Sequence, residues 1–149
     1  MIPVPEYFIS LFPRDVCLDG ELWIGYERFN ELCSILRKTM HRDVEPQTIS
    51  ELWKNIKFCV FDAPKHEGDY SSRHSFASES ISCCGPNILM IPKEECLGLE
   101  HLQNTLHQIS FKKGEGIILY HPKSSYTSGR TNHVLKVKAY QEEDVKYLE

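Results

Sequence analysis

Charged side chains recur at short, regular spacing in three places along the chain. Asp19 and Glu21 are separated by one residue, as are Lys136 and Lys138, and Glu115 stands between two glycines. Residues two apart in a β-strand point to the same face, so each pair would present like charges side by side. Paired lysines can neutralise a phosphate, and carboxylates can hold a divalent cation or a ribose hydroxyl. Together these groups suit phosphoryl or nucleotidyl transfer.

Each of these features also has a plainer interpretation. Alternating charges are typical of a strand with one face in water, and an acid between glycines is typical of a turn. Phe61 offers an aromatic face for a base, a contact worth roughly 1–3 kcal/mol, but a lone phenylalanine is more often part of a core. The serines of 124–128 and Arg130 are equally typical of a surface loop. Spacing alone leaves open whether these faces converge on one site.

Basic residues are concentrated toward one end of the chain. Between Phe111 and Tyr140, five lysines and Arg130 stand against one acid, Glu115, a balance of +5. The rest of the chain must therefore carry −9 to give the net charge of −4. Such segregation is typical of a surface that binds a polyanion.

The elements that position these residues alternate between strands and helices. Alternating patterns or short apolar runs predict strands over 16–24, 56–63, 87–91, 115–120 and 134–140. Helical spacing predicts helices over 27–40 and 48–55, and a third along Leu99, Leu102, Leu106 and Ile109, with a weak helical signal over 73–80. The T-I-S-E sequence that begins at Thr48 would support a capping box. Both faces of 56–63 are partly apolar, which indicates a strand covered on both sides or lining a pocket.

Composition indicates one soluble globular domain, because 149 residues with 41% hydrophobic content can bury a core. The six cysteines contain no CxxC pair, which favours reduced thiols in an intracellular protein over a disulfide or zinc framework. The seven histidines lack HExxH spacing, which argues against a dedicated zinc site. The opening 13 residues are apolar but broken by three prolines, so they predict neither a signal peptide nor a membrane span.

Four short motifs resemble motifs III, IIIa, IV and V of the covalent nucleotidyltransferases in order and spacing. They are LDGEL at 18–22, FCVFDAP at 58–64, GEGIIL at 114–119 and LKVK at 135–138. Within that superfamily, EGIIL followed by P-x-S-x-Y-x-x-GR and LKVK is most similar to the adenylation domain of ATP-dependent DNA ligases. The resemblance implies an α/β (α+β type) fold with partly antiparallel sheets and flanking helices. It would be an incomplete nucleotidyltransferase (ATP-grasp-like ligase) domain spanning 1–149.

The resemblance also implies roles for individual residues. Glu21 would contact the nucleotide sugar and help order the site, and Phe61 would stack on adenine. Lys136 and Lys138 would contact the α-phosphate and offset its charge during adenylyl transfer. Glu115 would serve Mg²⁺.

A second set of residues would face the nucleic acid. Lys123, Ser125 and Arg130 lie in the loop that approaches the nicked backbone in such ligases, so the resemblance implies phosphate contacts for all three. The partners it implies are ATP, Mg²⁺ and nicked double-stranded DNA. We expect a monomer that acts in DNA repair, replication or recombination. It would not associate with membranes, and it would be nuclear if the organism is eukaryotic.

One part of the family pattern is absent from the sequence. These ligases attack ATP with the lysine of a KxDG motif upstream of LDGEL, but the 17 residues before Leu18 contain no lysine. The 11 residues after Lys138 leave no room for an oligonucleotide-binding-fold domain and its final motif. We therefore expect a fragment of a longer ligase, or a degenerate paralogue, that alone does not form the lysyl-adenylate.

Two alternatives remain. The chain could be related to RNA ligases or to mRNA-capping guanylyltransferases, in which an aspartate and a tryptophan often replace the residues corresponding to Glu115 and Val137. It could instead be a non-catalytic nucleic-acid-binding module that retains only the basic loop.

Overall fold

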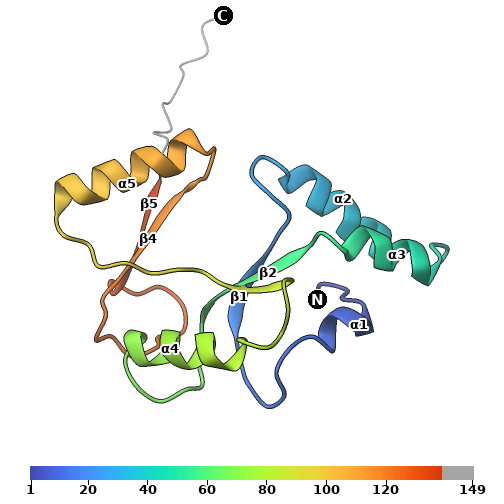
Figure 1. The fold of residues 1–149 in the computed structure, drawn as a ribbon, viewed down its shortest axis with the longest axis horizontal. Coiled ribbons are helices and arrows are strands. Elements are labelled where there is room, and N and C mark those ends of the chain that lie inside the picture. Colours follow the sequence, from blue (N-terminus) through green and yellow to red (C-terminus); the bar gives the residue numbers. More distant parts are fainter. Residues whose placement is uncertain (139–149) are drawn as a thin grey trace, which may run out of the picture.

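Two small β-sheets organise residues 1–138, the part of the chain that the computed structural model describes (Figure 1). The first sheet contains β1 (Asp19–Trp23), β2 (Lys57–Asp62) and β3 (Ile88–Met90) in that order, and the second contains β4 (Gly116–Tyr120) and β5 (Val134–Lys138). β1 pairs antiparallel with β2, β2 pairs parallel with β3, and β4 pairs antiparallel with β5. The fold is therefore mixed α/β with partly antiparallel sheets, as the sequence predicts.

Five helices accompany the two sheets in this part of the chain. They are α1 (Glu6–Ile9), α2 (Phe29–Met40), α3 (Pro46–Trp53), α4 (Tyr70–Ser80) and α5 (Leu99–Phe111). α2 packs on α3, α4 packs on β2, and α5 packs on β4. Figure 1 shows α5 with the second sheet on one side of the molecule and the α2–α3 pair on the other. Within residues 1–138, no helix has the length and apolar character needed to cross a lipid bilayer.

The hydrophobic core belongs to the first sheet and the helices around it. Its largest fully buried side chains are Trp53, Phe8, Ile56 and Val60. Trp53 packs edge-on against Phe8 with ring centroids 5.1 Å apart, and its indole N–H donates to Thr39 Oγ1 at 2.8 Å. A buried indole that keeps a hydrogen-bond partner combines a large apolar contact with a satisfied polar group. α5, in contrast, has no buried residue.

The observed strands follow the predicted ones, with shorter ends. Strands predicted over 16–24, 56–63, 87–91 and 115–120 correspond to β1, β2, β3 and β4. The strand predicted over 134–140 corresponds to β5, and its last two residues lie outside the described part. The helix predicted over 27–40 begins at Phe29, and the helical stripe from Leu99 to Ile109 is α5.

The start of α3 corrects one prediction. The helix expected over 48–55 begins at Pro46, with Glu45 at the N-cap and no side-chain capping bond, so the capping box at Thr48 is wrong. Proline suits the first helical position, because its φ is already helical and its missing N–H would lack a partner there. Pro46 therefore starts the helix before Thr48 is reached.

α4 is a stronger element than its sequence indicates. The weak signal covers only 73–80, but the helix begins at Tyr70, where the Asp69 side chain accepts a hydrogen bond from the Ser72 N–H at 2.9 Å. This capping bond lowers the pKa of Asp69 and satisfies one of the unpaired N–H groups of the first turn. The short helix α1 was not predicted, and all six cysteines are free in the structure.

Candidate functional site

An irregularity in the pairing of β1 and β2 shapes the site. Asp19 lies opposite Asp62, but Gly20 lies opposite Val60, so Phe61 has no partner in β1 and forms a bulge. Bulges re-aim side chains and are common beside active sites. Gly20 makes this close pairing possible, because a Cβ on it would lie 2.6 Å from the Cys59 carbonyl oxygen and from the Phe58 ring. The close approach of β1 and β2 therefore requires glycine at this position of LDGEL.

A pocket of about 250 Å³ opens between β1, β2 and the loop that joins β4 to β5. Asp19, Phe61 and Asp62 line it from the first sheet, with Arg73 of α4 and Tyr120 at the end of β4. Ser124, Ser125, Tyr126, Thr127, Gly129, Thr131, His133 and Val134 line it from the loop and the start of β5. The pocket thus joins two parts of the chain that are far apart in sequence.

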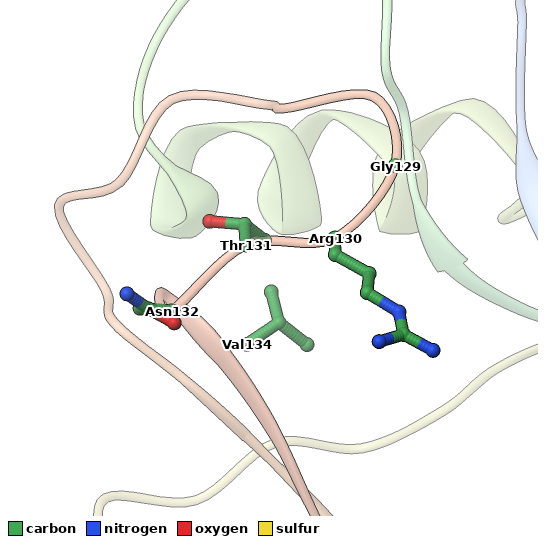
Figure 2. Close-up of a pocket in the computed structure, with 5 residues that line it drawn as sticks. All are labelled: Gly129, Arg130, Thr131, Asn132 and Val134. Carbon is green, nitrogen blue, oxygen red and sulfur yellow. The ribbon is translucent and has the colours of Figure 1, made fainter.

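A second, more open pocket of about 470 Å³ lies beside the first on the same loop (Figure 2). Gly129, Arg130, Thr131, Asn132 and Val134 line it. Figure 2 shows the Arg130 side chain extending away from Asn132, with Val134 between them. The predicted DNA-contacting arginine therefore borders a surface hollow.

The β4–β5 loop is held against the first sheet and α4 by several contacts. The Tyr126 hydroxyl donates to Asp19 Oδ2 at 3.0 Å, and the Ser71 N–H donates to the Pro122 carbonyl oxygen at 3.2 Å. The Tyr120 and Tyr70 rings stack with centroids 3.8 Å apart and planes 7° from parallel. These contacts hold in place two residues that line the smaller pocket, Tyr120 and Tyr126.

The tyrosines around this pocket favour their neutral forms. Burial, followed by the charges of Asp62 and Asp19, raises the pKa of Tyr120 to about 12, with a smaller contribution from Glu21. Burial also raises the pKa of Tyr70, and the hydrogen bond to Asp19 raises that of Tyr126. At neutral pH these three tyrosine side chains therefore carry no charge.

Glu21 lies on β1 directly opposite Cys59, and its side chain is exposed. Burial raises the pKa of the Cys59 thiol. The positive charge of Lys57 lowers this pKa, and the negative charge of Glu21 raises it further. Glu21 and Phe61 are therefore positioned by adjacent strands of one sheet.

Lys136, Lys138 and Glu115 belong to the second sheet. Lys136 lies opposite Ile118 and Lys138 opposite Gly116, and the Lys136 ammonium is 3.6 Å from Glu115 Oε2. The two side chains of this ion pair are 55% and 87% exposed, so the pair adds little stability. An exposed carboxylate can exchange such a partner readily for another cation.

Glu115 supplies one carboxylate to this surface, and Mg²⁺ in proteins usually takes one or two carboxylates together with phosphate oxygens and water. Within residues 1–138, no group of three or more His, Cys, Asp or Glu side chains forms a metal site made by protein alone. Any Mg²⁺ held by Glu115 would therefore take its other ligands from phosphate oxygens or water.

The structure sorts the predicted site residues into groups. Phe61 and Ser125 line one pocket, Arg130 lines the adjoining one, and Glu115 pairs with Lys136. Lys123 is exposed in the same loop, where its backbone N–H donates to His121 Nδ1 at 3.3 Å. The individual roles of these residues stay predictions.

Sequence reasoning missed four residues that shape the site: Asp62, Arg73, Tyr120 and Tyr126. Asp62 lies inside FCVFDAP and Tyr126 inside P-x-S-x-Y, so both were already marked by motifs. Tyr120 directly follows GEGIIL. Arg73 had no comparable signal, because it lies in a polar, serine-rich segment with weak helical periodicity.

The comparison with known proteins agrees with this architecture. Residues 4–138 match the family model described as the ATP dependent DNA ligase domain. The chain therefore belongs to the ATP-dependent DNA ligase family, which confirms the resemblance carried by the four motifs.

Two relatives show how far the likeness extends. The chain is 27% identical over 141 residues to a DNA ligase of Haemophilus influenzae, covering 94% of this chain and 49% of that protein. A solved structure from a study of Lig E DNA ligases, which concerns DNA binding with a minimal scaffold, is 28% identical with a TM-score of 0.76. That match covers 92% of this chain and 51% of the other. The chain thus spans about half the length of the relatives it matches.

Proposed function

We propose that this chain serves ATP-dependent DNA ligation, the sealing of nicks through adenylyl transfer. The observation that carries the proposal is the pocket in which Phe61 of β2 meets the loop between β4 and β5. That loop also bears Lys123, Ser125 and Arg130. One site would then place a nucleotide beside a nucleic-acid backbone, as adenylyl transfer to a nick requires.

On the nucleotide side, Phe61 stacks on the adenine ring and Glu21 hydrogen-bonds the ribose. Lys136 and Lys138 share one face of β5 and place two ammonium groups toward the α-phosphate, which offsets the charge that develops there. Mg²⁺ bound through Glu115 would supply further neutralisation of the phosphates. Binding then releases Lys136 from its ion pair with Glu115, an inexpensive step because both side chains are exposed.

On the DNA side, Lys123, Ser125 and Arg130 contact phosphate oxygens. All three are exposed, and they follow one another on a single loop. Contacts of this kind set affinity and register without reading sequence, which suits an enzyme that acts at nicks in any sequence.

The covalent step is a separate part of the proposal. The 149 residues contain no KxDG motif, and covalent nucleotidyl transfer by the family route needs that lysine. We therefore propose that this chain by itself binds ATP without forming a lysyl-adenylate.

Equilibrium binding of ATP and GTP in the presence of magnesium tests the nucleotide site. We expect ATP to bind more tightly than GTP, and Phe61→Ala to weaken ATP binding by roughly 5- to 150-fold, because base stacking is worth roughly 1–3 kcal/mol. Glu21→Ala should weaken ATP binding as well, whereas Glu31→Gln on α2 should not. Unchanged ATP affinity in both pocket variants would contradict the proposed site.

Incubation with ATP labelled at the α-phosphate tests the covalent part. Denaturing electrophoresis should show no labelled protein. A covalent adenylate band would overturn the proposal that the chain lacks a working nucleophile.

A further inference from the structure

We infer that Arg73 is a positioning residue for DNA contact, acting through the Ser124 carbonyl to hold the β4–β5 loop in its DNA-facing conformation. The inference rests on the proposed function for its DNA part. Its structural part, that Arg73 fastens the loop, stands on the contacts of the described residues.

Arg73 is one of the most buried charged groups among residues 1–138, with its side chain 3% exposed. Its Nε donates to Asp62 Oδ1 at 2.8 Å, and its Nη2 donates to Asp62 Oδ2 at 3.4 Å. Asp62 is 4% exposed and also accepts the Ala63 N–H at 2.8 Å. The two charges therefore compensate each other inside the protein.

The remaining donor of this fork points away from the carboxylate. Nη1 donates to the Ser124 carbonyl oxygen at 2.9 Å and to the Gly68 carbonyl oxygen at 3.0 Å. Ser124 is only 7% exposed, although both of its neighbours, Lys123 and Ser125, are exposed. The loop is therefore anchored at its one buried residue, between two residues proposed to face DNA.

The aromatic surroundings reinforce this anchor. The guanidinium carbon lies 5.7 Å from the centroid of the Tyr70 ring and 5.8 Å from that of Tyr126. Because Tyr126 belongs to the loop, this ring contact joins Arg73 to the loop at a second place. An arginine can do this because its planar group accepts ring contacts while its N–H groups form in-plane hydrogen bonds.

Stability alone does not account for this arrangement. A buried ion pair can often be replaced by apolar residues of similar volume at no loss of stability, because the charges must first be desolvated. What an apolar pair cannot supply is a charged hydrogen bond to a loop carbonyl. Loops are ordinarily the more mobile parts of a fold, and Lys123 and Arg130 would otherwise spread over many conformations before binding.

Limited proteolysis tests the anchor without DNA, since trypsin can cleave after Lys123 and after Arg130 inside the loop. Arg73→Lys keeps a positive charge beside Asp62 but loses the fork that reaches Ser124. We expect loop cleavage to accelerate at least about tenfold relative to cleavage after Lys54 in the same molecule, the factor that removal of a charge-assisted hydrogen bond implies.

Arg28→Lys is the matched control. Arg28 also binds a carboxylate through Nε and Nη2, at 2.8 Å each to Glu31, and a backbone carbonyl, that of Ile24, through Nη1 at 3.0 Å. It lies on the α2 side of the molecule, outside the loop contacts. Its replacement should leave loop cleavage at the wild-type rate.

The second readout is the salt dependence of binding to nicked DNA. If the loop no longer presents its cations, the slope of log affinity against log salt should become shallower by roughly 0.9 for each phosphate that the protein no longer neutralises. A variant that was only less stable would bind DNA with lower apparent affinity but keep the wild-type slope. Arg28→Lys should also keep that slope.

Asp62→Leu combined with Arg73→Met keeps the test decisive if Arg73→Lys fails to fold. It leaves no unpaired charge in the core, and it should fold with an open, rapidly cleaved loop. The inference is overturned if the Arg73 variant that folds shows the same rate of loop cleavage and the same salt slope as Arg28→Lys. Absence of salt-dependent nick binding by the wild type would instead refute the proposed function, while the cleavage result would still decide whether Arg73 holds the loop.

Discussion

Phe61 and Asp62 are neighbours in the chain but have different environments. The bulge opposite Asp19 leaves Phe61 half-buried at the wall of a pocket, while Asp62 is 4% exposed and paired with Arg73. One residue of the motif FCVFDAP is therefore available to a ligand, and the next belongs to the structure that supports it. A change at each should affect a different property.

Removing the Asp62 charge should destabilise the fold strongly. Asp62→Asn leaves the Arg73 guanidinium buried without its counter-charge, which typically costs about 3–5 kcal/mol in the free energy of unfolding. Urea denaturation followed by tryptophan fluorescence, to which the buried Trp53 contributes, measures this. Glu31→Gln, which removes the exposed partner of Arg28, should change the unfolding free energy little. Equal losses in the two variants would contradict the assignment of Asp62 as a buried support.

Tyr120 should make stability sensitive to alkaline pH. Its pKa is raised to about 12 from an ordinary value of 10.0, so the folded state holds the proton more tightly than the unfolded chain. Stability from this group is fully present below pH 10 and decreases as the pH rises from 10 through 12. Tyr70, whose pKa is also raised, acts in the same direction.

Tyr120→Phe should flatten this dependence, because phenylalanine keeps the ring stack but has no proton to lose. The unfolding free energies of both proteins, measured in urea across this alkaline range, give the two slopes. Identical slopes would show that Tyr120 does not titrate differently in the folded and unfolded states.

At the scale of elements, the second sheet differs from the first in how it is supported. β1, β2 and β3 lie against the fully buried core, whereas β4 and β5 contain no fully buried side chain and pack with a helix that contains none. The backbone pairing of β4 with β5 must therefore contribute much of the order in this part. Both lysines proposed to contact phosphate depend on that pairing.

Gly116 tests this dependence directly. A Cβ at this position would overlap the Val137 carbonyl oxygen and lie 2.9 Å from the Lys138 Cα, and backbone atoms cannot move aside without separating the strands. Gly116→Ala should therefore open the β4–β5 pair.

Amide hydrogen exchange locates the damage of Gly116→Ala. Exchange should accelerate in 117–120 and remain slow at Val60 in the core of β2. Ile118→Ala, at a position on the same strand whose side chain is 45% exposed, should leave the exchange of both regions near wild type. Unchanged exchange in 117–120 of Gly116→Ala would contradict the close pairing.

The elements that sequence predicted well are those with a strong period. Short, mainly apolar stretches marked β2 and β4, and the spacing from Leu99 to Ile109 marked α5, because these patterns reflect which faces are covered. α4 was underestimated because its buried face includes Arg73 and His74, polar residues that are paired in the fold. No period could reveal those partners, which come from β2, the β4–β5 loop and the segment after β3.

The same reason limits what could be predicted of the site. Motif order placed Glu21, Phe61, Glu115 and Lys136 on strands, and the structure has them there or, for Glu115, directly before β4. The bulge at Phe61 depends on the register between two strands, and the Arg73–Ser124 contact joins residues 51 positions apart. Such pairings follow from tertiary packing and have no local signature.

At the scale of the whole molecule, charge and architecture coincide. The basic segment between Phe111 and Tyr140 contains both strands of the second sheet and the loop that closes over the first. The rest of the sequence carries the negative excess. This separation directs one part of the molecule toward a polyanion, in a chain that belongs to the ATP-dependent DNA ligase family.

The β4–β5 loop is central to the proposed function, because it would bind the backbone at a nick while the first sheet serves the nucleotide. A non-catalytic module would bind DNA in the same way but show no ATP site. In both cases DNA binding survives Glu21→Ala and Phe61→Ala, so ATP binding separates the two functions, and the loop itself must be tested with DNA.

The most direct measurement is a salt titration of the binding of the full chain to a nicked duplex with a 5′-phosphate and to the same duplex without the nick. We predict tighter binding to the nick, with a slope that becomes shallower by roughly 0.9 for each cation removed in Lys123→Ala with Arg130→Ala. Arg42→Ala with Lys54→Ala, on the segment that links α2 to α3 and at the end of α3, should keep the wild-type slope. Equal affinity for nicked and intact DNA, or equal slopes in the two double variants, would contradict a nick-binding role for the loop.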